Sequence, residues 1–271
     1  MLDGGLATEL ERRGHDLGGG LWSARLLRAD PGAIEDVHRA VFAAAGIGFD
    51  DTTRLLALSV ELARRARDAA RPGGLVAASV GPYAVMLADG SEYTGDYRGA
   101  TRAAIAAVQR PRIAALLGAA PDLLAFETIP VVDEVAVLAE LLAEHPGAVA
   151  WITFCCRDGA RLSDGSPVED AAAVAAASGR FAALGVNCTA PEHIDELLGR
   201  LRAVTALPLV VYPNAGRAWN AVRRAWGPGG ADRFDAAAVA GWRAHGATAI
   251  GGCCGIGPDG IAAVAAALSG S

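Results

Sequence analysis

The sequence predicts an α/β fold, a single (β/α)8 TIM barrel that occupies residues 1–271 as one domain. Three observations predict it. The chain has 271 residues, close to the ~250 residues of a typical barrel of this kind. Short, nearly continuous apolar runs recur along it, as expected of strands that are buried on both faces of a parallel sheet. Amphipathic helical patterns separate these runs.

The first helix is expected at residues 30–46. Asp30 can cap it, and Pro31 suits its first position. Its apolar residues recur at spacings of three and four, so they share one face. Gly46 can end the helix in a left-handed turn.

Seven strands are expected after that helix. They lie at residues 48–52, 75–80, 123–127, 148–154, 182–188, 207–212 and 247–251. Helices are expected at residues 55–70, 97–117, 132–145, 167–178, 191–204, 235–245 and 258–268. An additional first strand would end at Asp3, although a strand usually needs about five residues.

An open, doubly wound sheet is the structural alternative to a closed barrel. No Gly-x-Gly-x-x-Gly motif opens a helix after the first strand, so a dinucleotide-binding fold has little support. The Gly- and Pro-rich stretch at residues 226–230 is expected to be a loop, and no linker or second domain is evident.

Composition excludes several classes of protein. Hydrophobic residues make up 52% of the chain, which argues against disorder. The net charge is −6, whereas a nucleic-acid-binding protein normally carries a basic face. No apolar run approaches the ~20 residues of a membrane span, and no cationic leader is evident. The default expectation is a soluble, cytoplasmic protein whose partners include neither nucleic acid nor a membrane.

The chain has five cysteines, an odd number for a disulfide framework. They form two adjacent pairs and a single residue: Cys155-Cys156, Cys253-Cys254 and Cys188. In a reducing compartment, clustered cysteines more often bind metal or take part in catalysis. Cys155 and Cys156 follow a strand but belong to no matching pattern, and buried core thiols are the favoured interpretation for them.

Polar and reactive residues stand where several expected strands give way to loops. They are Asp3, Thr52, Glu127, Cys188, Asn214, Cys253 and Cys254. The carboxyl ends of barrel strands form the active-site face. Cys188 ends the sixth strand and Cys253-Cys254 end the eighth, on either side of the seventh, so the three thiols can share one ion.

Three thiolates with an open fourth position are typical of a catalytic zinc site, with Zn–S distances of about 2.3 Å. Glycines beside Cys253-Cys254 supply the bend that lets two consecutive side chains face one metal. Zinc deprotonates a thiol that it binds, and such a site suits attack by a thiol substrate on an electrophilic carbon. On spacing alone, buried core cysteines remain an equal alternative.

Two motifs, Gly185-Val186-Asn187-Cys188 and Gly251-Gly252-Cys253-Cys254, occur in order with several further stretches. Those stretches run from Leu2 to Leu10, Leu21 to Ala24, Ser79 to Tyr83, Leu87 to Tyr93, Phe126 to Pro130, Leu162 to Gly165 and Val211 to Gly216. The ordered set covers nearly the whole chain and resembles the homocysteine S-methyltransferase family. The resemblance implies a zinc-containing (β/α)8 barrel with one Zn²⁺ per chain.

The same resemblance implies roles for individual residues. Cys188, Cys253 and Cys254 would be the zinc ligands, with the sulfur of homocysteine as the fourth. The remaining substrate-binding residues would be Asp3, Gly4, Thr52, Glu127 and Asn187. Glu127 and Asp3 would bind the substrate ammonium, and the backbone at Gly4 and Thr52 would meet its carboxylate. Alternatively, Glu127 caps the helix that follows Pro130, and Asp3 is an ordinary turn residue.

The resemblance implies S-methylmethionine, or S-adenosylmethionine, as the methyl donor, with betaine users as a related branch. Aromatic rings can hold the positive charge of a sulfonium group. The candidates for this donor pocket are Trp22, Tyr83, Tyr93 and Tyr212, each of which could instead be packing at the barrel mouth. One departure stands out: the family usually shows Thr-x-Ser/Thr-aromatic after the Thr52 position, whereas this chain has Thr52-Thr53-Arg54-Leu55.

Three functions follow from these observations. The leading one is a homocysteine S-methyltransferase that makes methionine by direct transfer of the methyl group. A second keeps the zinc site but uses another thiol or a selenol, such as selenocysteine, as the acceptor. A third is a barrel without turnover that senses zinc or redox state. The sequence does not predict the oligomeric state.

Overall fold

A computed structural model describes residues 1–2, 6–14, 49–87, 89–217, 219–220 and 225–270. Its centre is a sheet of six parallel strands in the order β1-β2-β3-β4-β5-β8. These strands are β1 (Ala77–Val80), β2 (Leu123–Ile129), β3 (Ala150–Phe154), β4 (Ala183–Asn187), β5 (Leu209–Tyr212) and β8 (Ala247–Ile250). All six were expected from apolar runs, and each begins and ends within about two residues of its expected position.

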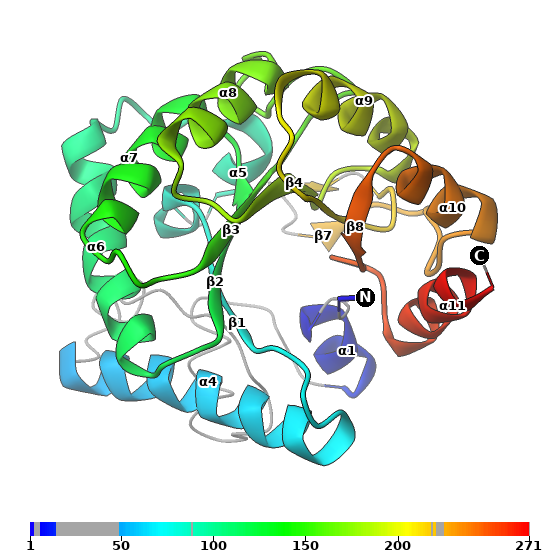
Figure 1. Cartoon of the computed structure of the whole chain (residues 1–271), viewed down its shortest axis with the longest axis horizontal. Helices are drawn as coiled ribbons and strands as arrows, with labels where there is room; N and C mark the ends of the chain where they lie inside the picture. The colour runs from blue at the N-terminus through cyan, green and yellow to red at the C-terminus, as the bar shows by residue number, and fades with distance from the viewer. Residues whose placement is uncertain (3–5, 15–48, 88, 218, 221–224, 271) are drawn as a thin grey trace.

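Helices separate consecutive strands and lie outside them (Figure 1). The long ones are α4 (Phe49–Ala70), α6 (Arg102–Gly118), α7 (Val132–Ala143), α8 (Val168–Ser178), α9 (Ile194–Val204), α10 (Ala236–Ala244) and α11 (Pro258–Ser269). Their ends follow the sequence: Thr101 caps α6, Asp235 caps α10, and Gly179 ends α8 in the left-handed conformation. This alternation is that of a (β/α) barrel.

Shorter elements lie in the loops. They are α1 (Leu6–Arg12), the 3₁₀ turn η1 (Tyr83–Met86), α5 (Ser91–Thr94), the 3₁₀ turn η2 (Pro191–His193), and the two-residue strands β6 (Trp219–Asn220) and β7 (Ala225–Trp226). The strands β6 and β7 pair with each other in an antiparallel ribbon. The loop expected at residues 226–230 therefore begins one residue later, after Trp226.

The strand expected at residues 48–52 is wrong. Residues 49–52 form the first turn of α4. Two aspartates, Asp50 and Asp51, stand at this point; aspartate is rare in strands but is favoured at the positive end of a helix. Thr52 is thus the fourth residue of a helix rather than the end of a strand, and the positional argument for its binding role fails.

The chain start lies beside the last strand. The backbone N–H of Leu2 donates to the carbonyl of Ile250 over 2.8 Å, so these residues pair as a first barrel strand would with the eighth. Asp3 and Gly4 lie outside the described residues. Helix α1 is held to the loop after β8, because the hydroxyl of Thr8 accepts the N–H of Gly255 over 2.8 Å.

The core lies between the strands and the helix ring. Strand residues such as Val80, Phe126, Ile152, Val186 and Val211 are all fully buried. Within the described ranges, no helix is both long enough and apolar enough to cross a lipid bilayer.

We predict that Gly185→Ala destabilises the fold by about 3 kcal/mol, the upper range for overpacking. A Cβ atom at residue 185 would lie 1.7 Å from the carbonyl oxygen of Val210 on the neighbouring strand. The control is Gly199→Ala in α9, where nothing lies within 4 Å, and which should stabilise by up to about 1 kcal/mol. Urea unfolding measures both variants; equal stabilities would contradict the prediction.

Candidate metal centre

Three cysteines from two strand ends meet at the carboxyl edge of the sheet. Cys188 follows β4, and Cys253 and Cys254 follow β8 after two glycines. The three Sγ atoms all lie within 4.8 Å of one another. The Sγ of Cys254 lies 3.6 Å from that of Cys188 and 3.9 Å from that of Cys253.

These separations fit one metal ion. Four sulfurs arranged tetrahedrally at about 2.3 Å from a metal lie about 3.8 Å apart along each edge. All five cysteines are free thiols, so no disulfide accounts for the close approach. Among the described residues, this is the one group of three or more metal-binding side chains at such distances. Three protein ligands leave a fourth position for a substrate.

The backbone is shaped to bring the three thiols together. Cys188 adopts a φ of 48°, in the left-handed region that non-glycine residues rarely occupy. Its N–H donates to the carbonyl of Tyr212, and the N–H of Cys253 donates to that of Pro213, so both cysteine loops are tied to the end of β5. Gly255 has a φ of 86°, and a Cβ there would lie 2.4 Å from Ala215. Glycine is therefore required just after the cysteine pair.

Contacts within the cluster change the acidity of its thiols. Hydrogen bonds from Cys253 and Cys254 hold the pKa of Cys188 well below its usual range, despite its burial. The same kind of contact, from Cys188 and Cys254, raises the pKa of Cys253, and burial adds to it. One thiolate is thus already favoured by its neighbours, and a bound cation would displace the remaining protons.

Cys155 and Cys156 are different. Both side chains are buried, and burial raises the pKa of each thiol. Cys156 packs in the hydrophobic core, and the Sγ of Cys155 donates to the carbonyl of Cys188 over 3.7 Å. These contacts agree with the core role expected for this pair.

The side-chain amide of Asn187 links β2 and β3 to the cysteine cluster. Its Oδ1 accepts the N–H of Thr128 at 2.6 Å and the hydroxyl of Thr153 at 2.8 Å. Its Nδ2 donates to the hydroxyl of Thr128 at 2.8 Å and reaches the Sγ of Cys253 at 4.0 Å. Thr128 also has a positive φ of 64° and lies where the β2–β3 register shifts. Bulges of this kind often re-aim side chains next to active sites.

Glu127 occupies the same irregularity in β2. One carboxylate oxygen accepts the hydroxyl of Ser79, and the other accepts the hydroxyl of Tyr212 at 2.9 Å. Tyr212 also bonds to Thr153 at 2.8 Å, and burial together with the charge of Glu127 raises the pKa of the Tyr212 phenol. Glu127 therefore belongs to the network that includes Asn187.

Of the four aromatic candidates for the donor pocket, two contact residues of the candidate site. Tyr93 reaches Cys188, with its hydroxyl 3.3 Å from the Sγ, and Tyr212 bonds to Glu127. Tyr83 instead lies against Tyr97, with 5.3 Å between ring centroids. Trp22, Asp3 and Gly4 lie outside the described residues, and for Thr52 only the backbone is described.

Sequence reasoning missed several residues around the cluster. They are Ser79, Glu92, Thr128, Thr153 and Asn214, whose side chain donates to the carbonyl of Cys188. Asn214 was noted at a strand end, but no role was assigned to it. Burial, and to a lesser extent the charge of Cys188, raises the pKa of Glu92. The signal that could have found most of them is position, because parallel strands end at one edge of the sheet.

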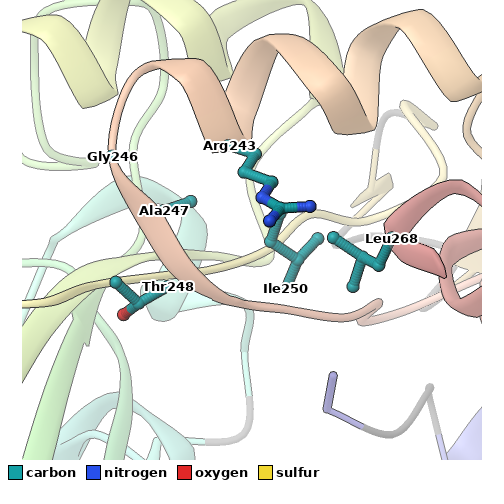
Figure 2. Close-up of a pocket in the computed structure, with 6 residues that line it drawn as sticks. All are labelled: Arg243, Gly246, Ala247, Thr248, Ile250 and Leu268. Atoms are coloured by element: carbon teal, nitrogen blue, oxygen red, sulfur yellow. The ribbon is translucent and has the colours of Figure 1, made fainter. Parts of the chain in front are cut away.

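A surface pocket of about 530 Å³ lies elsewhere. Its lining residues are Arg243, Gly246, Ala247, Thr248, Ile250 and Leu268. Figure 2 shows that they come from α10, the start and length of β8, and α11. Its lining runs along β8 from Ala247 at the amino end to Ile250 at the carboxyl end. None of the cysteines lines it, so it is distinct from the cysteine cluster.

Comparison with known proteins decides the family. The family model described as "Homocysteine S-methyltransferase" matches residues 1–47 and 43–268. The chain belongs to the homocysteine S-methyltransferase family. A homocysteine S-methyltransferase from Escherichia coli is 44% identical, over 98% of this chain and 94% of that protein. A selenocysteine methyltransferase from Astragalus bisulcatus is 34% identical, over 99% and 92%.

A solved structure shares the fold. The metallated crystal structure of the homocysteine methyltransferase MmuM from Escherichia coli matches with a TM-score of 0.85 and 42% identity, over 98% of this chain and 94% of that one. The match confirms the predicted barrel fold and agrees with a metal site at the cysteine cluster. A family of methyltransferases also favours an enzyme over the sensing barrel that the sequence left open.

The alignment also exposes a difference from the family. It spans 292 positions with the E. coli relative, whereas this chain has 271 residues, so at least 21 aligned positions hold no residue here. The family model matches in two stretches, residues 1–47 and 43–268, which overlap just before α4 begins at Phe49. The helix expected at residues 30–46 lies outside the described residues.

We predict that metal binding protects Cys253 and Cys254 from alkylation. Both are half-buried, whereas Cys155 and Cys156 are buried, so iodoacetamide should label the first pair in metal-free protein and spare the second. One equivalent of Zn²⁺ should suppress the labelling, because coordination lowers the electron density on each cysteine sulfur and holds it in the cluster, where iodoacetamide reaches it less easily. Mass spectrometry of the peptides measures this. Equal labelling of Cys253 with and without Zn²⁺ would contradict it.

Proposed function

We propose that this chain is a zinc-dependent homocysteine S-methyltransferase that makes methionine, with S-methylmethionine or S-adenosylmethionine as the donor. The observation that carries the proposal is the triangle of Sγ atoms from Cys188, Cys253 and Cys254, with 3.6 Å and 3.9 Å between the two pairs that include Cys254. Its edges suit tetrahedral zinc with one position left for a substrate sulfur. Family membership supports the acceptor.

Zinc held by these three cysteines would act as a Lewis acid and lower the pKa of a thiol that binds to it. The substrate sulfur would then be deprotonated near neutral pH. The reaction itself is a displacement at carbon. The acceptor sulfur forms a bond to the methyl carbon as the bond from that carbon to the donor sulfur breaks. The electron pair stays on the donor sulfur, which becomes a neutral thioether, and the thiol proton passes to solvent.

The chain's own residues position the acceptor. We assign the ammonium of homocysteine to Glu127, whose carboxylate is oriented by the hydroxyls of Ser79 and Tyr212. Both hydroxyls donate to it, so the carboxylate remains an acceptor with lone pairs available for a cationic donor. Asn187 fixes the bulge of β2 against the loop that bears Cys188, so the distance between the ammonium and sulfur sites is set by the sheet. Productive geometry of this kind contributes to rate by positioning.

A second acceptor has support from one observation. A relative at 34% identity is named as a selenocysteine methyltransferase. Selenolates are soft ligands like thiolates, so the same three cysteines could serve a selenol acceptor. Parallel assays with homocysteine and selenocysteine at equal concentrations distinguish the two.

The proposed function is tested by a methionine-formation assay with homocysteine and each donor in turn, with metal content measured on the same preparation. We expect turnover with at least one sulfonium donor and about one zinc per chain. Bound zinc without methyl transfer to any thiol or selenol would overturn the proposal.

We predict that Cys254→Ser loses zinc and methyl transfer together. A serine hydroxyl stays protonated and is a poor zinc ligand, whereas all three thiolates are needed to complete the site. Metal analysis after dialysis and the methionine assay give the two readouts. The matched control is Cys156→Ser, a thiol outside the cluster, which should keep its zinc. Full turnover by metal-free Cys254→Ser would refute the assignment.

We predict that Glu127→Gln raises the KM for homocysteine by about 30-fold, since a hydrogen bond to a charged group contributes about 2 kcal/mol. Zinc content should stay the same, because Glu127 lies outside the cysteine cluster. Steady-state kinetics measure the KM. Glu140→Gln is the control, because Glu140 pairs with Arg102 on the exposed surface. The KM of this variant for homocysteine should not change. An unchanged KM in Glu127→Gln would rule out the ammonium contact.

A further inference from the structure

One tyrosine touches a metal ligand. The hydroxyl of Tyr93 lies 3.3 Å from the Sγ of Cys188, close enough for a hydrogen bond to sulfur. Tyr93 belongs to the short helix α5, far from β4 in the sequence. A tyrosine phenol ordinarily has a pKa of about 10 and is a neutral O–H group at pH 7, and this one lies against a sulfur atom.

The direction of this hydrogen bond follows from the chemistry of the ligand. A cysteine bound to a metal is deprotonated and can only accept. A neutral tyrosine hydroxyl can donate. When the centre holds a metal, Tyr93 must therefore be the donor and the Cys188 thiolate the acceptor.

The segment that carries Tyr93 is fastened at several points. Asp89 accepts the N–H of Ser91 at 3.1 Å at the start of α5, and the hydroxyl of Ser163 donates to the carbonyl of Glu92 at 2.9 Å. After α5, Gly95 packs so closely on Asp164 that a Cβ would lie 2.4 Å from that side chain. The loop from β3 thus holds α5 over the carboxyl edge of the sheet.

A buried polar cluster fixes the far end of the same segment. The hydroxyl of Tyr97 donates to Glu134, which also accepts the N–H of Tyr83 at 2.8 Å and the amide of Gln109 at 2.7 Å. Glu134 and Gln109 are fully buried. Satisfied buried networks of this kind rigidify what they join, so Tyr93 is held between two anchors.

We propose that Tyr93 is a positioning residue of the metal centre, whose hydroxyl donates a hydrogen bond to the Cys188 thiolate and thereby orients this ligand and withdraws charge from its sulfur. Outer partners of metal ligands commonly act in this way. The inference rests on the metal centre of the proposed function. It assigns the Tyr93 hydroxyl to the ligand sulfur, where the sequence suggested a sulfonium-binding ring.

The test uses Tyr93→Phe in the full chain with Co²⁺ in place of zinc and no substrate present. Removing the donor leaves more electron density on the Cys188 sulfur, so the sulfur-to-cobalt charge-transfer band should move to longer wavelength. Zinc affinity, measured by competition with a chromophoric chelator, should fall about 10-fold. Thermal unfolding of both metal-free proteins reports whether the variant is folded.

Tyr97→Phe is the matched control. It removes a buried tyrosine hydroxyl from the same segment, but one that bonds to Glu134 rather than to sulfur. We expect it to lower thermal stability and leave the cobalt band in place. A band and a zinc affinity unchanged in Tyr93→Phe would overturn the proposal, as would an equal band shift in Tyr97→Phe. Failure of the unaltered protein to bind cobalt or zinc would instead overturn the metal centre and the proposed function with it.

Discussion

The cysteine cluster depends on strand order: the ends of β4 and β8 lie on either side of β5. Cys188 follows β4 and Cys253-Cys254 follow β8, and β5 pairs with both strands. Backbone hydrogen bonds also fix the cysteines themselves, since the N–H groups of Cys188 and Cys253 donate to carbonyls at the end of β5. The separation of the thiols is thus fixed by the spacing of parallel strands, which differs little between barrels. A flexible loop could not guarantee it.

Two strained backbone positions lie at this edge of the sheet. Two of the four described non-glycine residues with positive φ are Thr128 and Cys188, and the side chain of Asn187 lies between them. Its amide uses both the N–H and the hydroxyl of Thr128. Residues in the left-handed region cost free energy and persist where surrounding contacts determine them. One buried amide therefore couples the Glu127 bulge to the cysteine loop.

The strands of the sheet could be predicted because strands that are buried on both faces appear in the sequence as continuous apolar runs. The approach of Cys188 to Cys253 and Cys254 could be predicted because strand order places the ends of their strands together. By contrast, the strand at residues 48–52 was wrong, since Asp50 and Asp51 begin a helix there. The link from Tyr93 to Cys188 could not be predicted, because it depends on how the loop after β3 folds over α5, and no periodicity encodes such a contact.

The departure at Thr52-Thr53-Arg54-Leu55 falls within a helix. These residues belong to α4, and the two stretches that match the family model, residues 1–47 and 43–268, overlap just upstream. The departure therefore stands in the first turns of a helix, where the end of a strand was expected. Glu127 lies on β2, and the three cysteines of the cluster follow β4 and β8. The proposed sites for the substrate sulfur and ammonium therefore lie on other elements than α4, which carries Thr52, the residue expected to meet the substrate carboxylate.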